Sequence, residues 1–354
     1  MKTLRSSLTH GTMAVAIGAL TLFTAVEARA ESITVLNFAN YMPEDILQRF
    51  KDKTGISVDL VTTSTNEETM GRLTTSNGAG FDVVFVSSPF AEALRHLDLV
   101  TDVNHANLPN LVNLYDEAKN LSFDPGNVYT VPYAWGTTGL CYRDDLLSKA
   151  PTSWWDLLKP SDEAKGKITM VSTDRWLLAA GQLANGYSVN DVTPEHLEKV
   201  KADLIAAKKT LLAYDDATFY SKLVAGEAVM VHAWDGWCNY ALAETPHAHF
   251  VVPKEGSDFY IDVMVVPKAS EHKEAAEKFI NFVLEPENQG WVSTNLFFKT
   301  PNRIAMEALP EDIKKKYPNL TITPADLAKF ETFHDLGADL PRVSKVVTEI
   351  TSSR

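Results

Sequence analysis

The sequence predicts an α/β protein whose sheets are open, mostly parallel and flanked by helices. Three observations support this prediction. Strand-like and helix-like segments alternate along the chain, the segment 81–86 is apolar almost throughout, and hydrophobic residues make up 45% of the 354 residues. Alternation of strands and helices is typical of parallel sheets. The composition excludes a disordered chain, a collagen-like repeat and a disulfide-stapled miniprotein, and the length suits roughly two domains.

The first part of the chain alternates without a break. The expected strands and helices are, in order, 33–38, 43–55, 57–61, a helix opening after 65, 81–86 and 90–97. Pro43 and Gly55 mark the start and the end of the first helix. Thr65 and Glu68 have the spacing of a capping box. The apolar run 81–86 is typical of a strand that is covered on both faces.

The later chain repeats this pattern. Strands are expected at 168–171, 227–233, 250–253 and 262–266, and helices at 194–211, 220–223 and 275–283. In open α/β sheets, ligands bind beyond the carboxyl ends of strands, often near helix N-termini. Residues 37–41 and 87–89 follow two such strand ends, so we expect them to lie near a binding site.

Residues 1–30 have the pattern of a cleaved secretory signal. Lys2 and Arg5 precede a mostly apolar stretch, 13–26, and the segment ends in the small-x-small sequence 28–30. The apolar stretch is shorter than the roughly 20 residues that a membrane-spanning helix needs. We therefore expect export to the periplasm, a mature chain starting at Glu31 and no membrane insertion after cleavage.

The net charge bears on the class of partner. The formal charge is −13, from 33 basic and 46 acidic residues. An acidic protein gains nothing from counterion release on DNA or RNA and is poorly suited to anionic membrane surfaces. The charge argues against a nucleic-acid partner and is compatible with a small cationic ligand.

Two cysteines, Cys141 and Cys238, lie in apolar or aromatic stretches far apart in the chain. An exported protein could join them in a disulfide, whereas buried free thiols are the simpler alternative. We expect free thiols, because neither cysteine has CxxC spacing.

Signatures of catalysis and of cofactor binding are missing from the sequence. It contains no GxSxG elbow, HExxH, Walker A motif or complete GxGxxG after a strand. His232, His247 and His249 are candidate metal ligands, but no acidic or cysteine partner accompanies them in the sequence. We expect no cofactor, no metal and no catalytic residue.

Aromatic residues beside polar ones gather at the expected strand ends. A ring face and a carboxylate together are what an organic cation needs. For any one aromatic residue, core packing is the alternative, but the clustering favours binding. The residues concerned are Phe38, Tyr41, Trp234, Trp237 and Tyr260, with the carboxylates Asp235 and Asp262.

Several stretches carry a resemblance to a known family. They are 37–43 (NFANYMP), 81–87 (FDVVFVS), 131–136 (VPYAWG), 152–157 (TSWWDL), 225–227 (AGE), 253–256 (PKEG), 278–286 (KFINFVLEP) and 300–302 (TPN). In order and spacing, the chain from Glu31 on resembles the periplasmic solute-binding proteins of ABC importers, specifically the spermidine/putrescine-binding group.

The resemblance implies a two-lobed fold of the type II-like periplasmic-binding-protein class, with a hinge of crossing strands near 135–141 and 260–265. Lobe 1 would contain residues 31–135 and 262–305, and lobe 2 would contain 136–261 and 306–354. Ligand would bind in the cleft between the lobes, with hinge closure around it. The closed form would dock on a membrane permease, without chemistry on the ligand.

The resemblance also implies roles for individual residues. Trp234 matches a ring-stacking tryptophan, and Asp262 matches the carboxylate that pairs with a ligand amine. Tyr260 stands at an aromatic wall position, Tyr41 at a tyrosine position and Ser87 at the serine that ends the third strand.

Departures from the family pattern concern the ligand. Phe38 replaces the usual tryptophan of the first loop, which keeps a ring and loses the indole donor. Thr173 and Trp176 stand where the spermidine type has acidic groups. Asn40 and Trp237 stand where the putrescine type has them.

Three kinds of ligand therefore remain open. A di- or polyamine would be held by Asp262 with Asp235 or Asp174. A monoamine or quaternary ammonium would sit among the five aromatic residues named above. A zwitterion would place its amine on Asp262 and its carboxylate on Arg175. Family inheritance favours the polyamine, whereas the lost carboxylates favour the other two, because an unpaired buried ammonium is costly. An exported enzyme and a receptor that serves a sensor are the competing classes.

Overall fold

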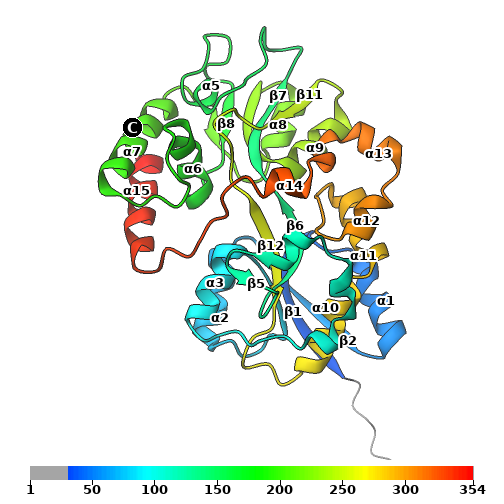
Figure 1. Cartoon of the computed structure of the whole chain (residues 1–354). Coiled ribbons are helices and arrows are strands. Elements are labelled where there is room, and N and C mark those ends of the chain that lie inside the picture. Colours follow the sequence, from blue (N-terminus) through cyan, green and yellow to red (C-terminus); the bar gives the residue numbers. More distant parts are fainter. Residues whose placement is uncertain (1–30, 354) are drawn as a thin grey trace, which may run out of the picture. The chain divides into compact units, whose positions relative to one another are not determined.

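The computed structural model describes residues 31–353 (Figure 1). The expected secretory signal, residues 1–30, lies outside the described residues. The chain from Glu31 onward forms one compact unit. Within residues 31–353, no helix combines the length and the apolar character that crossing a membrane requires.

The first lobe is built on a five-stranded sheet. Its strands, in spatial order, are β2 (Ser57–Thr63), β1 (Ser32–Phe38), β3 (Val83–Ser87), β12 (Tyr260–Val265) and β6 (Val131–Gly136). Strands β2, β1 and β3 run parallel, as the alternation of strands and helices predicts. Strand β12 is antiparallel to both β3 and β6, because it enters this sheet from the other lobe.

The second lobe repeats this arrangement in another five-stranded sheet. Its strands, in spatial order, are β11 (Ala248–Val251), β7 (Thr138–Arg143), β10 (Met230–Trp234), β8 (Ile168–Met170) and β9 (Ala213–Tyr214). Strands β10, β8 and β9 are parallel, whereas β11 and β10 are antiparallel to β7. A small hairpin in the first half of the chain joins β4 (Asn120–Leu121) and β5 (Asp124–Pro125).

Helices flank both sheets (Figure 1). Those of the first half of the chain are α1 (Glu44–Thr54), α2 (Asn66–Ser76), α3 (Ser88–His96), α4 (Asp116–Lys119), α5 (Trp154–Leu158), α6 (Asp174–Ala184), with the short 3₁₀ turns η1 (His105–Asn107) and η2 (Pro109–Asn113). The later ones are α7 (Pro194–Lys208), α8 (Phe219–Ala225), α9 (Asp235–Glu244), α10 (Lys273–Val283), α11 (Pro286–Trp291), α12 (Arg303–Glu307), α13 (Glu311–Lys316), α14 (Pro324–Leu327) and α15 (Leu340–Ser352), with the short turns η3 (Val292–Leu296), η4 (Pro318–Thr321) and η5 (Gly337–Asp339).

Local signals in the sequence set several of these boundaries. Helix α1 ends at Gly55, whose φ of 78° is the left-handed conformation that glycine adopts without a Cβ clash. Helix α2 is capped by Thr65, whose hydroxyl accepts from the backbone N–H of Glu68 at 3.2 Å. The Glu68 carboxylate accepts from the N–H of Ser64, one residue before the expected partner. Strand β3 is buried throughout, as its apolar run predicts.

The chain crosses between the sheets next to a single glycine. Strand β6 ends at Gly136 in the first sheet, and β7 begins at Thr138 in the second. The return crossing lies between β11 and β12, because β12 belongs entirely to the first sheet. The return crossing therefore precedes Tyr260. The residue limits expected for the two lobes from the sequence stay a prediction.

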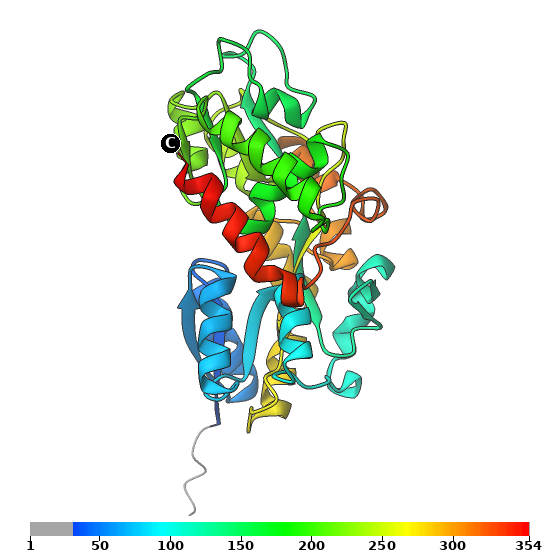
Figure 2. The same ribbon diagram turned by 90° about the vertical axis from the view of Figure 1, so that its left-hand side faces the viewer.

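The C-terminal helix α15 packs on the second lobe. It lies against α6 and α7, and Figure 2 shows α15 in red beside the green helices of that lobe. Val343, Val346, Val347 and Ile350 form its buried face. Their spacing of three and four residues is that of an amphipathic helix.

The expectation of free thiols is wrong. Cys141 on β7 and Cys238 on α9 form a disulfide, with Cα atoms 5.7 Å apart. The two residues are 97 positions apart in the sequence, but α9 packs directly on β7. Spacing along the chain could not reveal this contact, whereas exported proteins commonly contain such bonds.

Candidate functional site

A cavity of about 620 Å³ lies between the two sheets, beside the carboxyl ends of several of their strands. On one side it is lined by the loop after β1, the end of β3 and strand β12. On the other side it is lined by residues that follow β8 and β9 and by the end of β10. The volume lies in the range of small-molecule sites. Its position agrees with the expectation that ligands bind beyond strand ends.

Seven of the nine residues singled out from the sequence line this cavity. They are Phe38, Tyr41, Ser87, Trp234, Trp237, Tyr260 and Asp262. Asp235 and Arg175 lie outside its lining. Of the residues singled out from the sequence, those that reach the cavity are therefore one carboxylate, one serine and five aromatic side chains.

Asp262 is the buried carboxylate of the cavity, with 9% of its surface exposed. It stands opposite Ser87 in the β12–β3 pairing, and the Ser87 hydroxyl donates to its Oδ1 at 2.6 Å. The Tyr41 hydroxyl donates to Oδ2, also at 2.6 Å. Burial raises the pKa of Asp262, while these two hydroxyl groups lower it in part. A cation at this carboxylate would supply the missing opposite charge.

The partners of Asp262 are themselves held in place. Asn66 donates from Nδ2 to the Ser87 hydroxyl at 3.1 Å and accepts from the Ser87 backbone N–H at 2.9 Å. The Tyr133 hydroxyl donates to the carbonyl of Tyr41 at 2.7 Å. Burial raises the pKa of Tyr41 well above its ordinary value, and the nearby Asp262 charge adds to this, so the phenol stays a donor. The carboxylate is thus preorganised.

Asp235 does not point into the cavity, contrary to the reading in which it holds a ligand amine. It is 1% exposed and pairs with the buried ammonium of Lys299. Its Oδ1 also accepts from the hydroxyl of Tyr260 at 2.8 Å and from the N–H of Gly236 at 2.8 Å. These contacts occupy the carboxylate, and the bond to the Tyr260 hydroxyl supports the cavity wall that Tyr260 forms.

Arg175 likewise makes its contacts within the protein. Its guanidinium donates to the carbonyl of His334 at 2.8 Å and to Oδ1 of Asn190 at 2.8 Å, and it lies over the ring of Phe333. Burial lowers the pKa of Arg175 to about 10. The side chain holds the segment before α15 against the second lobe. Asp174 is also engaged, because its Oδ2 accepts from the Ser344 hydroxyl at 2.7 Å.

The aromatic wall of the second lobe combines edge-to-face and tilted ring pairs. The rings of Trp234 and Trp176 are 5.6 Å apart with an interplanar angle of 65°, and Trp237 lies 5.2 Å from Tyr240. Such arrangements fix ring positions and stabilise by about 1 kcal/mol per pair. The indole N–H of Trp176 is buried without a hydrogen-bond partner among the described residues. Trp176 lines the cavity, although only 4% of its surface is exposed.

Two further carboxylates line the cavity, and the sequence analysis did not single them out. Asp216 follows the short strand β9, and Glu67 lies in the first turn of α2. If a strand had been expected at 213–214, Asp216 would have been recognised as a residue that follows a strand end. Strand β9 has only two residues, too few for a periodic pattern in the sequence.

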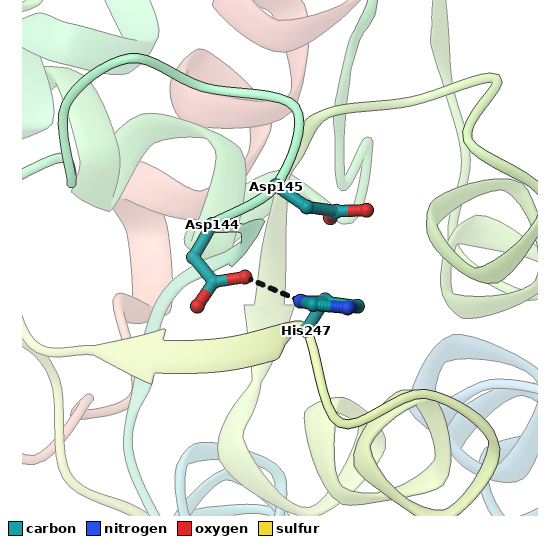
Figure 3. A group of neighbouring side chains, drawn as sticks. All are labelled: Asp144, Asp145 and His247. Atoms are coloured by element: carbon teal, nitrogen blue, oxygen red, sulfur yellow. Dashed lines mark hydrogen bonds and ion pairs between the residues drawn. The ribbon is translucent and has the colours of Figure 1, made fainter.

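One cluster outside the cavity has the residue types of a metal site. Ligand atoms of Asp144, Asp145 and His247 lie within 4.8 Å of one another, and Figure 3 shows them on the surface loops. Asp144 accepts from Nδ1 of His247 at 2.9 Å and from Nε2 of His249 at 2.8 Å, so the two histidines share one carboxylate. The carboxylate of Asp145 accepts from Nε and from one terminal nitrogen of Arg143, at 2.7 Å each. The cluster is exposed, and its hydrogen bonds account for its arrangement.

His232 is a core residue. It is fully buried, and its ring meets the Trp154 ring edge to face at 5.1 Å. Burial lowers the pKa of His232 to about 3, so the ring is neutral near pH 7. It therefore contributes packing.

Comparison with known proteins agrees with this geometry. The family model of the bacterial extracellular solute-binding proteins matches residues 45–334. The spermidine/putrescine-binding periplasmic protein of Escherichia coli K12 is 30% identical over 311 residues, covering 86% of this chain and 88% of that protein. The putrescine/cadaverine-binding protein of Pseudomonas aeruginosa is 28% identical over 336 residues, covering 91% and 94%.

A solved structure supports the fold over the same span. The spermidine/putrescine ABC transporter substrate-binding protein PotD of Streptococcus pneumoniae superposes with a TM-score of 0.78 at 26% identity. The match covers 90% of this chain and 98% of that one. The chain is therefore a two-lobed solute-binding protein rather than an enzyme, and it belongs to the family of bacterial extracellular solute-binding proteins.

Proposed function

We propose that the protein is the periplasmic receptor of an ABC importer and captures a small amine-bearing solute, foremost a polyamine such as putrescine or spermidine. The observation that carries this proposal is the carboxylate of Asp262, buried in an aromatic cavity and fixed by the hydroxyls of Ser87 and Tyr41. A buried carboxylate without a cationic partner is costly, and an ammonium group supplies that partner.

The aromatic lining supports the same class of ligand. Phe38 and Tyr41 stand on the first lobe, and Trp234 and Trp237 stand on the second. Ring faces attract cations and also cover the methylene groups of an alkyl amine. Lobes that close around such a ligand would exclude water and strengthen its pairing with Asp262.

The relatives support the ligand, the location and the partner. Those from E. coli and P. aeruginosa are named for spermidine/putrescine and for putrescine/cadaverine, and the former is a periplasmic protein. The expected secretory signal at 1–30 agrees with a periplasmic location. A receptor of this kind hands its solute to a membrane permease, which is the partner that we propose.

A monoamine or quaternary ammonium ligand is the second candidate. All five aromatic residues of the expected cage line the cavity, and such a ligand needs only one carboxylate. A zwitterion has less support, because Arg175 is bonded to His334 and Asn190.

The test is a thermal-shift screen of the purified protein against putrescine, spermidine, choline, betaine, GABA and the basic amino acids. A ligand of the native state raises Tm in proportion to the logarithm of its concentration once the site is saturated. We expect putrescine or spermidine to give the largest shift. A shift with choline alone would establish the second candidate, and no shift with any amine would overturn the proposed function.

A further inference from the structure

A second carboxylate of the cavity, Asp216, is held in a fixed orientation. Its Oδ1 accepts from the backbone N–H of Ser172 at 2.8 Å and from the N–H and hydroxyl of Thr173 at 3.3 and 3.1 Å. Among residues 31–353, its Oδ2 accepts from the hydroxyl of Ser172 alone. Because a carboxylate oxygen accepts about two hydrogen bonds, Oδ2 retains capacity for a further donor.

Asp216 and Asp262 approach the cavity from different lobes. Asp262 lies on β12 of the first sheet, whereas Asp216 follows β9 at the edge of the second. The cavity between them is lined by the aromatic residues Trp176, Tyr220 and Trp234, which suit an alkyl chain. A ligand with a charged group at each end of an aliphatic chain would thus place its two charged groups at the two carboxylates and its chain against the aromatic rings.

We propose that Asp216 is the partner of the second ammonium group of a bound diamine, so that one ligand joins a carboxylate of each lobe. This inference rests on the proposed function and assigns the half of the ligand that Asp262 does not hold. It replaces the expected second partners, since Asp235 pairs with Lys299 and Asp174 bonds to Ser344.

Glu67 is the competing candidate, because it also lines the cavity. It lies on α2 of the first lobe, the lobe that already supplies Asp262. Among the described residues, no hydrogen bond fixes the Glu67 carboxylate, whereas the backbone and hydroxyls of Ser172 and Thr173 orient Asp216. A preorganised carboxylate loses less side-chain entropy when it binds.

The arrangement gives a diamine an effect that a monoamine lacks. A ligand shifts a hinge equilibrium only by its differential affinity for the two states. A monoamine on Asp262 contacts one carboxylate and gains little charge pairing from closure. A diamine that reaches Asp216 gains its second ion pair only when the lobes approach, so it favours the closed form.

The experiment compares putrescine with butylamine, which has the same carbon chain and one ammonium group. Calorimetric Kd values are measured for the unaltered protein, Asp216→Asn and the control Asp162→Asn. Asp162 is an exposed aspartate of the second lobe outside the cavity lining. We expect Asp216→Asn to weaken putrescine by about tenfold or more and to leave butylamine and the melting temperature nearly unchanged. The control should alter neither affinity.

Other outcomes separate the two proposals. If the unaltered protein binds neither amine, the proposed function itself fails. If it binds both amines and Asp216→Asn weakens them equally, or lowers only the melting temperature, Asp216 merely holds the segment that leads into α6 and the inference is overturned. If Glu67→Gln removes the preference for putrescine and Asp216→Asn does not, the second ammonium belongs to Glu67.

Discussion

At the scale of single residues, the buried ion pair of Asp235 and Lys299 stabilises the fold beside the cavity. Lys299→Met leaves the Asp235 charge buried with only neutral donors, which should destabilise the fold by about 3–5 kcal/mol. The double variant Asp235→Leu, Lys299→Met should recover most of this loss, because it leaves no unpaired charge. Guanidinium unfolding of the single and double variants measures both effects. A Lys299→Met protein as stable as the unaltered chain would contradict the assignment.

Asp258, beside the crossing strands, makes the unfolding free energy depend on pH with a sign that follows from its raised pKa. It is fully buried, and burial raises its pKa to about 6, although the Thr138 hydroxyl and other donors lower it in part. Its Oδ2 has no hydrogen-bond partner among the described residues. Because the folded pKa exceeds the ordinary value of 3.8, Asp258 contributes stability at low pH and loses it as the pH rises through 6.

Asp258→Asn should remove this contribution. Between pH 4.5 and 7.5, the unaltered protein should lose about 2 kcal/mol of unfolding free energy relative to the variant. Denaturant unfolding at the two pH values gives the difference, and carboxylates elsewhere cancel in the comparison. Parallel stability profiles for the two proteins would show that Asp258 ionises normally.

The same scale explains which site residues the sequence could predict. Trp234 ends one strand and Asp262 lies within another, and both strands can be recognised from apolar runs in the sequence. Residues at the carboxyl ends of neighbouring parallel strands lie close together at one edge of a sheet. The fates of Asp235 and Arg175 depend on Lys299, Asn190 and His334, which fold back from other parts of the chain. No local pattern encodes such pairings, so charge alone could not show that these two side chains lie outside the cavity lining.

At the scale of elements, the disulfide fastens α9 to β7. Helix α9 begins directly after Trp234 and carries Trp237, so its position sets part of the cavity wall. Replacing Cys141 and Cys238 by alanine should lower the unfolding free energy by about 4–5 kcal/mol if loop closure in the unfolded chain dominates. Guanidinium titration of the variant, and of the unaltered protein with reductant, tests this value. An unchanged midpoint would mean that packing alone holds α9.

The elements also show where sequence patterns fail. Long periodic segments such as α1 and α10 were predicted nearly to their ends. Strand β9 was missed because two residues carry no periodicity, and with it Asp216 was missed. The antiparallel position of β12 follows from the return of the chain between lobes, which a run of apolar residues does not specify.

At the scale of the whole molecule, two similar sheets place different chemistry on the two sides of one cavity. The first lobe supplies a buried carboxylate with its two hydroxyl partners, and the second supplies tightly packed aromatic rings and an exposed carboxylate. The acidic net charge of −13 adds a long-range attraction for cationic solutes at low ionic strength. The fold class and the presence of a cleft could be predicted from the order of segments and from the family resemblance. The partner of each charge depends on tertiary contacts.

The most direct test of the account is the affinity for putrescine of the unaltered protein and of Asp262→Asn, measured by calorimetry. Asp59→Asn, an exposed neutralisation on β2 of the same lobe, serves as the matched control. We expect Asp262→Asn to weaken binding by about a hundredfold or more with little change in melting temperature, and the control to bind normally. Equal affinities of Asp262→Asn and the unaltered protein would contradict the central claim that this carboxylate captures the amine.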